Sequence, residues 1–60
     1  MKATIEINMD NAAFDDRHSG RSEVARILRR LADDVLRRSC ADMTIRDING
    51  NSVGWLRFAN

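Results

Sequence analysis

The chain has 60 residues, with ten Lys and Arg side chains against nine Asp and Glu, so its formal net charge is +1. A chain of this length forms one domain with one core, and it buries only about 60% of the surface that its unfolded form exposes. The balanced charge excludes a strongly basic nucleic-acid-binding composition, and no run approaches the ~20 apolar residues of a membrane span. Because Cys40 has no cysteine partner and no signal-like segment opens the chain, we expect a cytoplasmic protein without a disulfide.

Residues 2–9 alternate strictly between polar and apolar side chains. The apolar members are Ala3, Ile5, Ile7 and Met9, and the polar members are Lys2, Thr4, Glu6 and Asn8. A period of two predicts a half-buried strand whose apolar face packs on a core. The next segment, residues 10–21, is rich in Asp, Asn, Ser and Gly and predicts a loop. Phe14 within it is expected to fold back on the core, or else to anchor a partner.

A helix is predicted for residues 22–39. Apolar residues recur there every three or four positions, at Val24, Ile27, Leu28, Leu31, Val35 and Leu36. Ser22 is the expected N-cap, and Glu23 complements the positive end of the helix dipole. Arg37 and Arg38 stand in the last turn, where cations are favourable.

The remaining part of the chain predicts a hairpin, with strands over residues 43–49 and 53–58 around a turn rich in Asn and Gly. One placement of the turn pairs Ile45 with Leu56, and the other pairs Met43 with Leu56. Both placements are open, and both put the same side chains on the same faces.

These elements predict an α+β domain of order βαββ that spans residues 1–60, with one helix packed on one face of a three-stranded sheet. Strand order 1-3-2 is favoured because both neighbouring pairs are then antiparallel. Order 1-2-3 would need a parallel pair, and the sequence leaves it open.

Residues for catalysis or cofactor binding are scarce. Nucleophilic catalysis would rest on His18 and Cys40, which the predicted helix holds ~33 Å apart. Asp33 and Asp34 are adjacent and do not face each other on a helix; they are expected to pair with Arg37 and Arg38. The spacings of a zinc site, a calcium loop and a phosphate-binding loop are missing from the sequence. We therefore expect no catalytic residues, no metal, no cofactor and no enzymatic activity.

Two surfaces are candidates for binding. Arg26, Arg29 and Arg30 form a local basic patch on the predicted helix, which favours weak nucleic-acid binding as an alternative function.

The second candidate is the sheet face that the helix leaves uncovered. Alternation sends Ile48, Val53 and Trp55 to that face, with Arg46 and Arg57 beside them. Exposed apolar patches with Trp and Arg are typical of protein interfaces. The alternative interpretation is that Arg46 merely stacks on Trp55 as a cation–π pair.

Three segments carry a resemblance: residues 10–14 (DNAAF), 23–33 (EVARILRRLAD) and 46–51 (RDINGN). Together they resemble small uncharacterised proteins of tailed phages and prophages. The resemblance implies a non-enzymatic interaction protein that binds and inhibits a host or defence protein in the host cytoplasm, such as an anti-CRISPR inhibitor. It implies no site residues. A structural virion component is a further alternative, and a homodimer is compatible with each of these functions.

Overall fold

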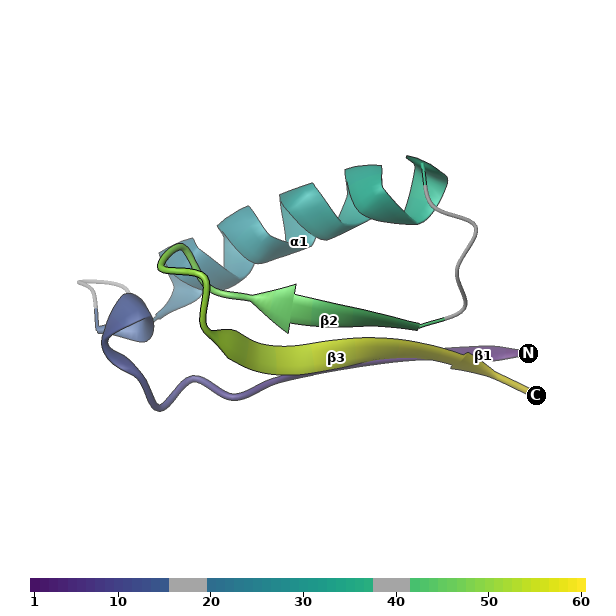
Figure 1. The fold of residues 1–60 in the computed structure, drawn as a ribbon, viewed down its shortest axis with the longest axis horizontal. Helices are drawn as coiled ribbons and strands as arrows, with labels where there is room; N and C mark the ends of the chain where they lie inside the picture. The colour runs from purple at the N-terminus through teal and green to yellow at the C-terminus, as the bar shows by residue number, and fades with distance from the viewer. Residues whose placement is uncertain (16–19, 38–41) are drawn as a thin grey trace.

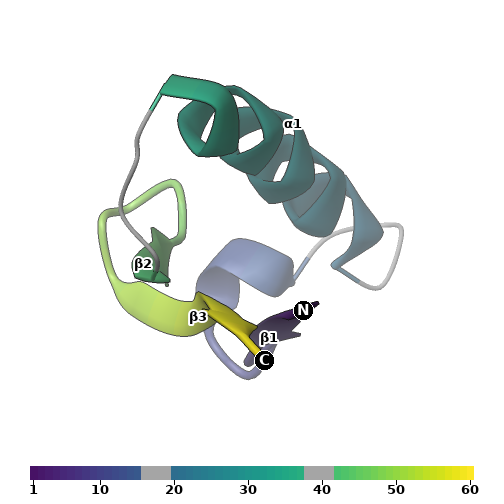
Figure 2. The same cartoon turned by 90° about the vertical axis from the view of Figure 1, so that its right-hand side faces the viewer.

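The computed structural model describes residues 1–15, 20–37 and 42–60. In chain order the elements are strand β1 (Lys2–Ile7), the 3-10 helix η1 (Ala12–Phe14), helix α1 (Arg21–Arg37), strand β2 (Asp42–Arg46) and strand β3 (Ser52–Ala59). Figure 1 shows α1 lying along one side of the sheet, and Figure 2 shows η1 on that same side. The predicted α+β fold is confirmed.

The three strands form one antiparallel sheet of order β1-β3-β2, the order that the sequence favoured. β1 pairs with β3 along its whole length, beginning with Lys2 opposite Ala59. β2 pairs Met43 with Leu56, which is the second of the two predicted registers. β3 is therefore the central strand, and β1 and β2 are the two edges.

The segment after β1 is more structured than the predicted loop. β1 ends at Ile7 because the Asn8 side chain accepts a hydrogen bond from the Asp10 N–H at 2.9 Å and turns the chain. The Asn11 side chain then accepts from the Ala13 N–H, which caps η1. Phe14 ends η1 and is buried in the core, as predicted.

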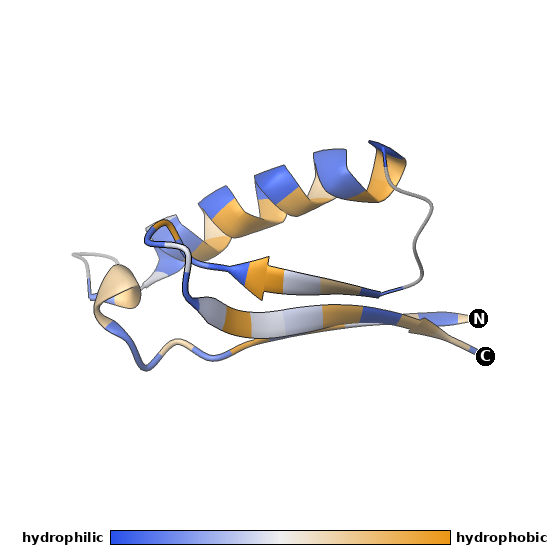
Figure 3. Ribbon diagram, in the orientation of Figure 1, coloured by the Kyte–Doolittle hydropathy of each residue, from blue (hydrophilic) through white to orange (hydrophobic). Residues whose placement is uncertain are grey.

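Helix α1 begins one residue earlier than predicted. It starts at Arg21, so Ser22 lies inside the first turn and is not the N-cap. Gly20 precedes the helix with a φ of 82°, and its carbonyl accepts from the Val24 N–H at 3.1 Å. The predicted end at residue 39 lies outside the described residues. Figure 3 shows the apolar side of α1 turned toward the sheet and the polar side turned away from it.

The core lies between α1, η1 and the two strands of the hairpin. Its buried members are Phe14, Ile27, Leu31, Met43, Ile45, Val53 and Leu56. β1 contributes less than predicted, because Ile5 is 46% exposed and Met9 is 40% exposed, while Ile7 is half-buried. The expectation that the whole apolar face of residues 2–9 packs on a core is wrong, since α1 packs on η1 and β2 rather than squarely over β1.

Candidate functional site

The predicted outer patch does not form, because Val53 points into the core. The register of β2 and β3 shifts between Ile45, which pairs with Gly54, and Arg46, which pairs with Ser52. This bulge leaves Val53 without a partner on β2 and interrupts the alternation of side chains. Val53 is only 7% exposed. Its assignment to the uncovered face was wrong.

Ile48 is exposed, but it lies on the helix side of the molecule. β2 ends at Arg46 rather than at residue 49, so Ile48 belongs to the turn. Its N–H donates to a carboxylate oxygen of Glu23 on α1 at 2.8 Å. Ile48 and Trp55 therefore belong to different surfaces.

Trp55 does lie on the uncovered face, opposite Glu6 of β1 and Thr44 of β2. The Arg57 guanidinium carbon lies 4.2 Å from the Trp55 ring centroid, so this arginine stacks on the ring. The predicted stacking of Arg46 is wrong, because its Nη1 donates to the Gly50 carbonyl at 3.2 Å. Trp55 with its stacked arginine is a smaller apolar surface than the predicted patch.

Two of the three arginines of the predicted basic patch pair with carboxylates of the same helix. Arg26 donates to both carboxylate oxygens of Glu23, at 2.7 and 3.0 Å. This hydrogen bond holds the pKa of Glu23 below its usual range despite the opposing effect of burial, and it raises the pKa of Arg26. Arg30 pairs with Asp34 at 3.6 Å, which leaves Arg29 as the member of the predicted basic patch without a described ion pair. The potential that a phosphate backbone would meet is correspondingly weak.

The ion pairs predicted for the end of the helix differ from those observed. Asp34 pairs with Arg30, which precedes it. Within the described part of α1, Asp33 and Arg37 form no ion pair. The predicted pair of Asp34 with Arg38 cannot be compared, since Arg38 lies outside the described residues.

A polar network around Asp47 joins the hairpin turn to Asn11, the residue that caps η1. The Asn49 and Asn51 N–H groups donate to Asp47 Oδ1 at 2.9 and 2.8 Å, and Asn11 Nδ2 donates to Oδ2 at 2.7 Å. Burial raises the pKa of Asp47, but these hydrogen bonds outweigh it, and the pKa lies below its usual value. Each carboxylate oxygen is occupied by donors of the chain itself, which is the arrangement of a structural group.

The described residues hold no group of three or more His, Cys, Asp or Glu side chains placed to bind a metal ion. His18 and Cys40, the two residues considered for nucleophilic catalysis, lie outside the described residues. No helix in the described ranges is long and apolar enough to cross a membrane.

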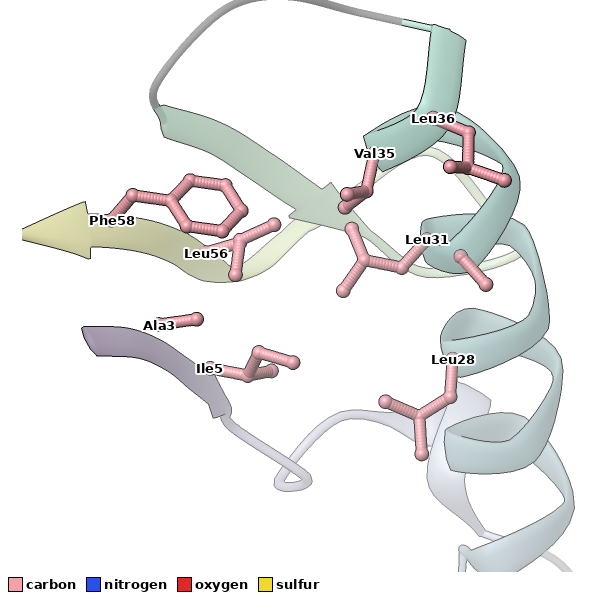
Figure 4. Close-up of a pocket in the computed structure, with 9 residues that line it drawn as sticks. Ala3, Ile5, Leu28, Leu31, Val35, Leu36, Leu56 and Phe58 are labelled. Carbon is pink, nitrogen blue, oxygen red and sulfur yellow. The ribbon is translucent and has the colours of Figure 1, made fainter. Parts of the chain in front are cut away.

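An open apolar groove lies between α1 and the sheet, with a volume of about 450 Å³. All its lining residues are apolar: Ala3 and Ile5 of β1, Leu28, Leu31, Ala32, Val35 and Leu36 of α1, and Leu56 and Phe58 of β3. Figure 4 shows Leu31 and Val35 directed toward Leu56 and Phe58, with Leu28 and Ile5 on either side of the open space. We call this surface the β1–α1 groove.

The groove exists because the helix is offset from the first strand. α1 packs on η1 and β2, and Figure 1 shows it rising away from the sheet toward its C-terminal end. The core residues Leu31 and Leu56 form the floor, while Ile5, Leu28 and Leu36 remain 46%, 44% and 87% exposed. These side chains would be covered if something occupied the groove.

The groove was not predicted from the sequence. The available signal was an excess of apolar side chains, because the helix stripe and the β1 face together exceed what one helix can bury against a small sheet. The offset of α1 from β1 results from tertiary packing, so no local sequence pattern indicates it.

Fold and groove together define a small α+β domain of order βαββ with an unfilled apolar surface. Comparison of the chain with protein-family models, with curated proteins and with solved structures found no match. The resemblance to phage proteins stays a prediction.

Proposed function

We propose that this chain is a non-enzymatic protein-interaction domain that binds another polypeptide in the β1–α1 groove. One observation carries the proposal: the large exposed apolar side chains of the described residues gather there. Seven such side chains are exposed, and four of them, Ile5, Leu28, Val35 and Leu36, line this one surface. Apolar surface concentrated in this way is typical of protein-binding sites.

The chemistry of the groove favours a polypeptide over a small ligand. Small-molecule sites combine apolar walls with a few polar groups that fix the orientation of the ligand. The β1–α1 groove offers no polar side chain among its lining residues. It does lie beside β1, an edge strand, whose backbone can add a further strand by hydrogen bonding.

We further propose which kind of protein this domain binds in a cell. The resemblance to small phage proteins supports a host or defence protein as the target, with inhibition, including inhibition of a CRISPR complex, as the outcome. That part rests on the resemblance alone.

Site-specific photo-cross-linking tests the proposal. A photoreactive amino acid replaces Leu28 in the groove or, as a matched control on the same helix, exposed Asp33, which helical geometry places on another face. The full chain is produced in cells and irradiated, and cross-linked products are identified by mass spectrometry. We expect a defined polypeptide partner at position 28 and none at position 33. Absence of a defined product at position 28, or equal products at both positions, would overturn the proposal.

A further inference from the structure

We propose that the polypeptide that fills the β1–α1 groove is a second copy of this chain, with the two β1 strands paired antiparallel about Thr4. The inference rests on the proposed function, because it names the partner of the same groove. Pairing of the two β1 strands gives a two-fold symmetric dimer in which the two three-stranded sheets form one continuous sheet of six strands.

The backbone of β1 is set up for this pairing. The Asn8 N–H, just after β1, donates to the Val53 carbonyl at 2.7 Å. Residues of an antiparallel strand alternate in the side to which their N–H and C=O groups point. The even-numbered residues of β1 therefore bond to β3, and Ala3, Ile5 and Ile7 direct their backbone groups to the outer edge. In the described part of the chain no strand occupies that edge.

The side chains of β1 select the register. Pairing about Thr4 places Lys2 of each copy opposite Glu6 of the other, and Ala3 opposite Ile5. Opposite charges on facing residues stabilise antiparallel pairs. Pairing about Ile5 instead would place Lys2 opposite Asn8, with no pair of opposite charges. If the two-fold axis instead passed between two residues of β1, each apolar residue would pair with a polar residue of the other copy. The apolar side chains of the two strands would then lie on opposite faces of the sheet.

The same symmetry closes the groove. A two-fold axis perpendicular to the sheet keeps both α1 helices on one face, so that the two grooves meet above the paired β1 strands. Leu28 and Ile5 border the opening, and Leu36 stands at its rim with 87% of its surface exposed. The sheet of the same copy leaves Leu36 uncovered.

A charge-swap series tests the proposed register. Sedimentation equilibrium of the full chain, up to millimolar concentration, measures the dissociation constant of the dimer. Lys2→Glu turns both Lys2–Glu6 pairs of the dimer into like-charge pairs, and Glu6→Lys does the same. We expect each single variant to dimerise about tenfold more weakly, and the chain with both substitutions to recover the original constant. A monomer at every concentration, or no recovery in the double variant, would overturn the inference.

A cysteine pair provides an independent geometric test. In a Cys40→Ser background, Thr4→Cys places two sulfurs opposite each other at the two-fold axis, at a separation suited to a disulfide. Thr44→Cys is the matched control, because it is an exposed threonine on the other edge strand. We expect mild oxidation to link the first variant into a covalent dimer and to leave the second without a covalent link, as judged by denaturing electrophoresis without reductant. The reverse result, or equal linking of both, contradicts the pairing.

The outcomes separate the two proposals. If photo-cross-linking at position 28 captures a different protein while the purified chain stays monomeric, the groove is a binding site and the inference of a second copy fails. If neither a second copy nor another polypeptide is captured there, both proposals fail.

Discussion

At Gly54 the absence of a side chain lets β1 lie directly against the central strand. A Cβ atom built at this position would overlap the Glu6 carbonyl oxygen, with the Ile7 Cα atom close behind. Both of these atoms belong to backbone, which cannot swing aside as a side chain would. Gly54 therefore fixes how closely the edge that borders the groove approaches β3.

The first prediction concerns Gly54→Ala. We expect this variant to lose at least about 2 kcal/mol of folding free energy, because overpacking against backbone displaces β1. Urea denaturation followed by circular dichroism measures the loss. Gly50→Asn is the control, since Gly50 has a φ of 85° that Asn tolerates and open space around it. Equal stability of Gly54→Ala and the parent chain would contradict the close approach of the strands.

The second prediction concerns acid stability and Glu23. Its pKa is lowered in the folded state, chiefly by the Arg26 side chain, so the folded state binds fewer protons than the unfolded state. This contribution to stability is complete above the unfolded pKa of about 4.3 and is lost as pH falls through the lower, folded pKa. We expect the urea midpoint to fall between pH 7 and pH 3 and to fall less in Glu23→Gln. An identical fall in both proteins would show that Glu23 contributes nothing to acid sensitivity.

At the scale of elements, α1 has one apolar stripe that serves two surfaces. Ile27 and Leu31 are buried in the core, whereas Leu28 is 44% exposed and Leu36 is 87% exposed along the groove. The hydrophobic period of the helix is the same for both sets. The buried and the exposed residues differ in their position around the helix axis, and only those on the side that contacts the sheet and η1 are buried.

The third prediction follows from that division and compares one substitution at two positions. Leu31→Ala should cost about 2 to 5 kcal/mol, because it opens a cavity in the core. Leu36→Ala should change the stability of the monomer by no more than about 0.5 kcal/mol, since the side chain is 87% exposed. Thermal unfolding in dilute solution measures both. A large loss for Leu36→Ala under these conditions would mean that Leu36 is covered within one chain.

Among the elements, local sequence patterns were sufficient for the helix and the strands, and they favoured the observed strand order without excluding the other one. The period of the side chains determines whether a segment is helix or strand, and the antiparallel preference then favours β3 at the centre. The bulge at Val53 was not predictable, because it lies where the Asp47-centred turn meets the pairing of β2 with β3, and no residue pattern marks that junction. One displaced residue was enough to reverse the face of Val53 and to remove the expected patch.

At the scale of the whole molecule, the groove shows the limit of reasoning from local patterns. The sequence indicates that the residues of the β1 face and the helix stripe are apolar, but it does not indicate how far apart these two surfaces lie. That distance depends on η1, where Phe14 packs beneath α1 and forms part of the core. The candidate site is therefore set by a segment that the sequence marked only as a loop.

The pairing of β1 with β3 also bears on how the domain folds. It joins Lys2 with Ala59, nearly the full length of the chain apart, whereas the β2–β3 hairpin and α1 form from neighbouring residues. Contacts so distant in sequence close a long loop and form late and slowly. We therefore infer an order of events in which the helix and hairpin assemble first and β1 adds last. The N-terminal strand would then be the last element to join the sheet during folding.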